Sequence, residues 1–187
     1  ANSPKPQFKS LESLNIPVLF VRNEKIAKKL RRSRELEGSV NLTAVEDITY
    51  NVAGLIDNGM RRTIIIGAHF DHLGMGGEGS RYMGEEPMIH NGADDNASGT
   101  AGLLAMARFL TETQDPLMRR FNYLLVAFSA EEMGLLGSKH FVEATSARQE
   151  DWHYMLNMDM IGRMEEETIA INGIGTSPYW RDLIEPI

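Results

Sequence analysis

Residues 63–67 read TIIIG, a short apolar stretch near the middle of the 187-residue chain. An unbroken apolar run of this length is typical of a strand that is buried on both faces of a sheet. Residues 121–128 (FNYLLVAF) and 152–158 (WHYMLNM) also favour strands, and the apolar residues 97–110 favour a helix. Strands that alternate with helices predict an α/β fold with a mostly parallel central sheet.

Further elements are expected on both sides of this core. Strands are predicted over 16–21, 40–45, 49–56 and 168–171, and helices over 24–34, over 132–144 and from Ser177 onward. Residues 74–92 contain six glycines and have almost no periodicity, so they are predicted to form a long loop. Loops of this length in compact domains are usually functional or disordered.

The composition excludes several classes of protein. Hydrophobic residues make up 42% of the chain, which is enough for a packed core. A net charge of −7 without a basic face argues against a nucleic-acid partner. The absence of cysteine excludes a disulfide framework, a thiolate zinc finger, an iron–sulfur cluster and a cysteine nucleophile. No apolar run reaches the ~18 residues that a membrane span needs. The sequence does not indicate the oligomeric state.

Acidic residues and one histidine cluster next to the predicted strands and helix. They are His69 and Asp71, Asp94 and Asp95, Glu131 and Glu132, and Asp159. Because the carboxyl ends of parallel strands form the ligand crevice of an open α/β sheet, these side chains are expected to converge at one edge. No lysine or arginine is expected nearby to neutralise them, so the set predicts a bound divalent cation.

The residue types indicate which cation and which chemistry to expect. Oxygen and imidazole ligands without sulfur suit Zn²⁺ in a catalytic site, with Mn²⁺ or Co²⁺ as possible substitutes. Residues i and i+2 of an extended chain point the same way, so the Asp71 carboxylate is predicted to accept a hydrogen bond from His69. Glu131 and Glu132 are adjacent, so one can bind metal while the other acts as a base in metal-assisted hydrolysis.

Each signal also has a purely structural interpretation. A single His-x-Asp at a strand end is more often structural, and paired acids are common at helix starts. Asp94, Asn96 and Ser98 also resemble the start of a calcium loop, but Ala105 stands at the twelfth position, where that loop needs a glutamate. The convergence of all the acids on one sheet edge favours the metal site over a set of independent structural roles.

Four stretches carry these residues: IIIGAHFDHLG (64–74), NGADDNASGTA (91–101), AFSAEEMGLLGS (127–138) and NMDMIGR (157–163). In sequence, order and spacing they resemble the co-catalytic di-zinc exopeptidases of the bacterial leucyl aminopeptidase type. The resemblance covers about residues 46–187. It implies a three-layer αβα fold, two zinc ions, hydrolysis of peptides that have a free N-terminus, and an exported location.

The resemblance also implies metal ligands. His69 and Asp159 would hold one zinc ion, Asp94 would bridge both ions, and Glu132 would hold the other. A non-proline cis peptide bond would follow the bridging aspartate, at Asp94–Asp95. The last ligand of the family, a histidine, would come from a segment after residue 187.

Two residues would act in catalysis, Glu131 as the general base and Asp71 by orienting His69. The same fold also supports other activities, so a carboxypeptidase, a glutaminyl-cyclase-like enzyme and a non-catalytic binding domain remain alternatives. Residues 1–45 resemble the end of a protease-associated domain, and residues 46–187 the first part of the catalytic domain. A fragment that lacks sequence at both ends is therefore expected.

Overall fold

A computed structural model describes residues 21, 23–33, 47–76, 80, 82, 86, 88–164 and 168–184. The chain divides into two units, Ala1–Glu46 and Asp47–Ile187. In the first unit, α1 (Glu24–Leu30) begins after Asn23, whose side chain accepts hydrogen bonds from two backbone N–H groups of the first turn. The predicted strands 16–21 and 40–45 lie outside the described residues except for Val21, which has no regular structure. The protease-associated identity of this unit stays a prediction.

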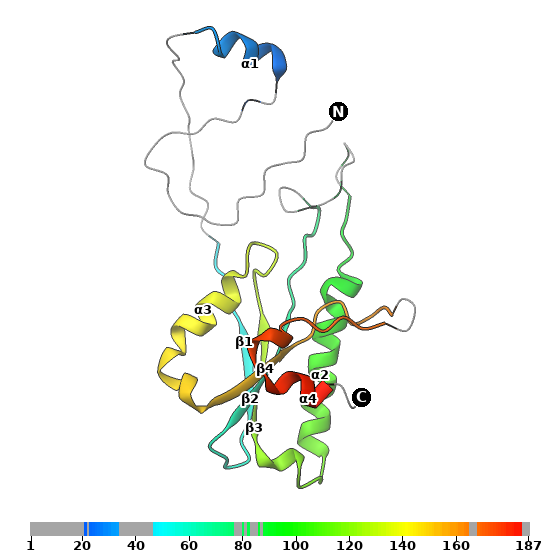
Figure 1. Ribbon diagram of the computed structural model, residues 1–187. Helices are drawn as coiled ribbons and strands as arrows, with labels where there is room; N and C mark the ends of the chain where they lie inside the picture. The colour runs from blue at the N-terminus through cyan, green and yellow to red at the C-terminus, as the bar shows by residue number, and fades with distance from the viewer. Residues whose placement is uncertain are drawn as a thin grey trace. The chain divides into compact units, whose positions relative to one another are not determined.

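The second unit is built on a four-stranded sheet in the order β1-β3-β2-β4 (Figure 1). Its strands are β1 (Val52–Ile56), β2 (Thr63–His69), β3 (Asn122–Phe128) and β4 (Trp152–Asn157), and its helices are α2 (Gly99–Glu112), α3 (Leu136–Ala144) and α4 (Tyr179–Ile184). Strand β2 pairs in parallel with β3 and with β4, whereas β1 runs antiparallel to β3. The α/β fold is confirmed, with a mixed sheet that has one antiparallel edge.

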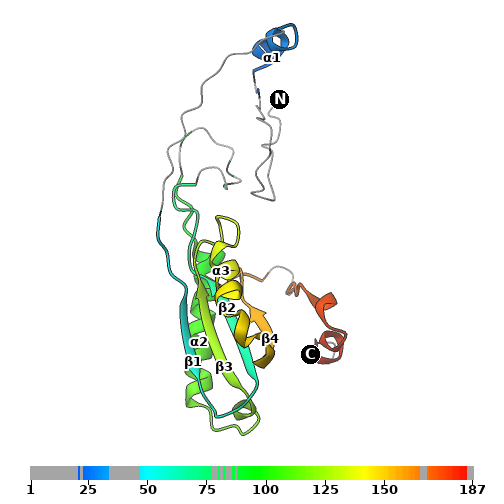
Figure 2. The same ribbon diagram turned by 90° about the vertical axis from the view of Figure 1, so that its left-hand side faces the viewer.

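Helices α2 and α3 lie on opposite faces of this sheet (Figure 2). Successive side chains of a strand point to opposite faces, so β2 contributes residues to two apolar clusters, one on each face of the sheet. Ile64 and Ile66 pack with Leu103 of α2, whereas Ile65 packs with Phe141 of α3. The apolar run of 63–67 is thus explained by helices on both sides of the central strand.

The helices differ from their predicted limits. Helix α2 begins two residues later and ends two residues later than the predicted 97–110. Helix α3 begins at Leu136 instead of residue 132, because residues 131–135 form a turn that ends with Leu135 in the left-handed region (φ 63°). Among the described residues, no helix combines the length and the apolar character needed to cross a membrane.

The predicted strand 168–171 is wrong. Thr168 makes an isolated bridge, and residues 169–173 have no regular structure. The helix predicted after Ser177 is present as α4, and its Trp180 packs edge-on against Tyr154 of β4, with ring centres 5.4 Å apart. The C-terminal part of the described chain is therefore tied to the sheet by an aromatic contact rather than by a further strand.

Candidate metal centre

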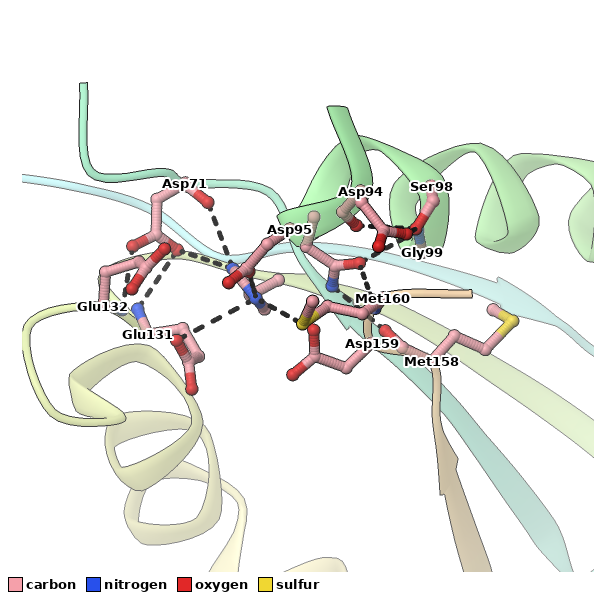
Figure 3. A network of polar contacts seen from close by, with 12 residues as sticks. Asp71, Asp94, Asp95, Ser98, Gly99, Glu131, Glu132, Met158, Asp159 and Met160 are labelled. Carbon is pink, nitrogen blue, oxygen red and sulfur yellow. Dashed lines mark hydrogen bonds and ion pairs between the residues drawn. The ribbon is translucent and has the colours of Figure 1, made fainter. Parts of the chain in front are cut away.

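The carboxyl ends of three parallel strands bring acidic side chains together. His69 is the last residue of β2, Glu131 lies three residues after β3, and Asp159 lies two residues after β4. The turn Ala93–Ser98, which precedes α2, adds Asp95. Figure 3 shows the carboxylates of Asp95, Glu131 and Asp159 gathered around one centre.

That centre is the imidazole of His69, which is 2% exposed. Its Nε2 lies 3.1 Å from a carboxylate oxygen of Asp95, 3.6 Å from one of Asp159 and 3.9 Å from one of Glu131. Among the described residues, this buried nitrogen has no hydrogen-bond partner. His69, Asp95 and Asp159 each offer one ligand atom, and these atoms lie within 4.8 Å of one another. One imidazole and two carboxylates at this spacing fit a zinc ion.

The other ring nitrogen of His69 fixes its tautomer. The Nδ1 atom lies 3.1 Å from the backbone carbonyl oxygen of Asp71 and donates to it. This bond leaves the lone pair on Nε2, the atom that faces the carboxylates, as metal ligation requires.

Asp71 contacts the site differently from the prediction. Its carboxylate is 3.7 Å from Nδ1 of His69, too far for a hydrogen bond. Instead it accepts from the backbone N–H groups of Glu131, at 3.1 Å, and of Glu132, at 3.2 Å. Asp71 therefore contacts His69 through its carbonyl group and the backbone of the two glutamates through its carboxylate.

Asp94 does not face His69, although the sequence favoured it as a ligand. Its carboxylate accepts from Nε of Arg163 and from the N–H of Gly162, both at 2.9 Å. The Arg163 hydrogen bond is the main cause that lowers the pKa of Asp94 below its ordinary value. The expectation that no basic residue is nearby is thus wrong.

The backbone explains why Asp95 faces the site instead. At Asp95 (φ −105°, ψ 92°) and Asn96 (φ −137°, ψ 43°) the chain leaves helical geometry, so neighbouring side chains point in different directions. The non-proline cis peptide bond also lies one residue further along than expected, at Asp95–Asn96 rather than Asp94–Asp95.

The two glutamates lie at the edge of the centre. Glu132 lines a cavity of about 220 Å³ together with His90, Asp95, Met160 and Arg163. Burial raises the pKa of Glu131, and the nearby carboxylates of Asp159 and Asp71 raise it further. Burial and Asp95 likewise raise the pKa of Glu132. Both groups therefore hold protons more tightly than an exposed glutamate does.

A family model described as "Peptidase family M28" matches residues 51–185, most of the chain and all of the site. The chain belongs to peptidase family M28.

Several curated relatives of this M28 chain have aminopeptidase names. Aminopeptidase YwaD of Bacillus subtilis is 42% identical over 77 residues, which are 41% of this chain and 16% of YwaD. Leucine aminopeptidase 1 of Ajellomyces capsulatus is 28% identical over 153 residues, 79% of this chain and 37% of that protein. Leucine aminopeptidase 2 of Trichophyton equinum is 32% identical over 135 residues, 70% of this chain and 26% of that protein.

The M28 chain spans between 16% and 37% of the length of these three relatives. Among solved structures, LapA of Legionella matches 59% of this chain and 27% of its own, with a TM-score of 0.46 and 23% identity.

The metal-free M28 chain is expected to be less stable at pH 8 than at pH 5. The pKa values of Glu131 and Glu132 are raised above about 4.5, so the folded state binds protons that the unfolded state releases, and stability falls as pH rises through this window. For His69, burial lowers the pKa, but the carboxylates of Glu131, Asp159 and Asp71 and the carbonyl of Asp71 together raise it above its ordinary value of 6.5. A raised histidine pKa gives stability that is present below pH 6.5 and is lost as pH rises further.

The measurement is the urea midpoint of the apo protein at pH 5 and pH 8, with and without saturating Zn²⁺. Zinc should raise the midpoint more at pH 8, because the cation replaces the protons that balance the acids. A Glu131→Gln variant should show a smaller pH dependence than the parent protein. An apo midpoint that rises from pH 5 to pH 8 would contradict this account.

Sequence reasoning missed two residues of the M28 site, Asp95 as the neighbour of His69 and Arg163 as the partner of Asp94. Nothing in the local pattern separates Asp94 from Asp95, because the turn is neither helix nor strand and has no periodicity to follow. For Arg163 a signal was present, since it lies four residues after Asp159 in the stretch NMDMIGR.

Proposed function

We propose that the protein is a metal-dependent aminopeptidase that removes residues from the free N-terminus of peptides. One observation carries the proposal: the Nε2 atom of His69 is buried, faces the carboxylates of Asp95 and Asp159, and has no hydrogen-bond partner among the described residues. Membership of family M28 and relatives with aminopeptidase names support it.

Two zinc ions would be held by the chain's own acids. His69, Asp95 and Asp159 would hold one, and Asp95 and Glu132 would contribute to the other. Asp95 would thus take the bridging place that the family resemblance implied for Asp94. Zinc bound there would supply Lewis-acid activation of a water molecule and of the scissile carbonyl, and Mn²⁺ or Co²⁺ would be possible substitutes.

Glu131 would be the general base. Its side chain is partly exposed beside the centre, so it can take a proton from the attacking water and deliver it to the leaving amine. The Asp71 carboxylate would hold Glu131 in place by accepting a hydrogen bond from the backbone N–H of Glu131.

The charge of the site supports a substrate with a free amino group. Four carboxylates, those of Asp71, Asp95, Glu131 and Asp159, lie within 4 Å of a ring nitrogen of His69. A protonated α-amino group is the part of a peptide that such a surface attracts. Export from the cell belongs to the same proposal and rests on the family resemblance.

The test compares peptides that differ only at their ends, using the complete natural protein loaded with zinc. A leucyl peptide should be hydrolysed at its first bond, and its N-acetylated form at least ~100-fold more slowly, because acetylation removes the charge that the acids bind. A chelator should abolish turnover, and added zinc should restore it.

Other results would replace this function by another. Release of residues from the C-terminus would indicate a carboxypeptidase, and cyclisation of an N-terminal glutamine would indicate a glutaminyl-cyclase-like enzyme. Zinc binding without turnover of any peptide would indicate a non-catalytic binding domain.

A further inference from the structure

Three successive backbone N–H groups just after Asp159 are bound by side chains of the turn that carries Asp95. Met160 donates to Oδ1 of Asn96 at 3.3 Å, Ile161 donates to Oγ of Ser98 at 3.0 Å, and Gly162 donates to Oδ1 of Asp94 at 2.9 Å. The acceptors stand at every second position, 94, 96 and 98. Figure 3 shows Asp94 and Ser98 on the side of the site away from Glu131.

Asn96 contacts the chain on both sides of Asp159. It is 1% exposed, and its Nδ2 donates to the carbonyl oxygen of Met158 at 3.0 Å while its Oδ1 accepts from Met160. The same Oδ1 accepts from the N–H of Gly99, the first residue of α2, at 2.9 Å. The backbone on either side of Asp159 is thus tied to the start of α2.

The approach of the two segments leaves no room for a side chain at residue 162. A Cβ atom on Gly162 would lie 2.9 Å from Oδ1 of Asp94 and 2.9 Å from Cβ of Ser98. Arg163, the next residue, adds its ion pair with Asp94 at 2.9 Å. Residues 160–163 are therefore in contact with the turn along their whole length.

We propose that Asp94, Asn96 and Ser98 are positioning residues that hold the Asp159 segment against the Asp95 turn and so preform the metal site. The inference rests on the proposed function, because it assumes that Asp95 and Asp159 bind the same cation. Asp95 lies between Asp94 and Asn96 in the sequence. The same turn would therefore supply the ligand Asp95 and hold in place the segment that supplies the ligand Asp159. Outer partners of this kind typically change metal affinity ~10–100-fold when they are removed.

The experiment compares Ser98→Ala and Arg163→Gln with two matched controls on α2. Thr111→Ala removes a hydroxyl that donates only within the helix, to the carbonyl of Ala107. Arg108→Gln removes an Nε–carboxylate pair with Glu112, at 3.0 Å, that is exposed and distant in sequence from the site segments. A Ser98→Thr variant keeps the hydroxyl and tests for rescue.

Two readouts are needed. The first is amide hydrogen exchange at residues 160–162 in the metal-free protein, and the second is the zinc dissociation constant from competition with a chromophoric chelator. Ser98→Ala and Arg163→Gln should speed exchange at these amides and weaken zinc binding by about 10-fold, whereas the controls and Ser98→Thr should stay within about 2-fold of the parent protein. The absorption spectrum of bound Co²⁺ should change in the same two variants.

The outcomes separate this inference from the function on which it rests. If the parent protein binds no zinc, the proposed metal site itself fails. If the parent binds zinc and the two variants bind it equally well, the site stands and the positioning roles are wrong. Faster exchange with unchanged zinc affinity would also overturn the inference, because the contacts would then serve the fold alone.

Discussion

Replacing Glu131 by glutamine is expected to lower the turnover of a leucyl peptide by about 10²–10⁴-fold, the usual contribution of a general base, while zinc content is unchanged. Glutamine has the same size but cannot accept a proton from water at neutral pH. The backbone N–H of residue 131, which donates to the Asp71 carboxylate, is not altered by the substitution. The loss should therefore appear in kcat rather than in folding or in metal binding.

The measurement is kcat and KM of the complete natural protein, together with zinc per chain. Glu112→Gln is the matched control, since Glu112 is exposed on α2 and pairs only with Arg108 among the ion pairs of the described chain. Its kcat should equal that of the parent protein. A Glu131→Gln enzyme with unchanged kcat would exclude Glu131 as the base.

The adjacent aspartates provide the second large contrast. Asp95→Asn should weaken zinc binding by more than the ~10–100-fold that loss of an outer partner costs, because Asp95 lies 3.1 Å from Nε2 of His69 and would contact both ions. Asp94→Asn should have a smaller effect, since Asp94 binds Gly162 and Arg163 instead. The two variants carry the same chemical change at neighbouring positions, so each controls for the other.

The zinc affinity of both variants, measured by chelator competition, shows which of the two aspartates binds the cation. Thermal unfolding without metal shows whether either substitution disturbs the fold. If Asp94→Asn weakened zinc binding more than Asp95→Asn, Asp94 would be the bridging ligand, as the family resemblance implied. The proposal that Asp95 bridges the ions would then be wrong.

The fold was largely predictable because its central elements are strongly apolar. Strand β2 is buried by α2 on one face and by α3 on the other, so its run of isoleucines has no polar interruption to obscure it. The incorrectly predicted strand at 168–171 has the opposite character, since Ile169 and Ile171 are exposed and have no regular structure.

The site was predictable where a strand end sets the direction of a side chain. His69 ends β2 with its side chain buried, and Asp159 follows β4 closely, so the topology alone brings them together. The choice between Asp94 and Asp95 depends on a turn whose conformation is set by hydrogen bonds to residues more than 60 positions away in the sequence. Contacts of that kind leave no periodic mark in the sequence.

The contacts between the Asp95 turn and residues 160–162 have a consequence for how the sequence can vary among relatives. The turn binds the backbone of that segment, and every amino acid except proline offers the same N–H group. Positions 160 and 161 should therefore exclude proline, and position 160 should favour residues that adopt the left-handed backbone of Met160 (φ 53°). Position 162 should stay glycine for lack of space. A change at Asp94 should be accompanied by a change at Arg163, so these two positions should co-vary although 69 residues separate them.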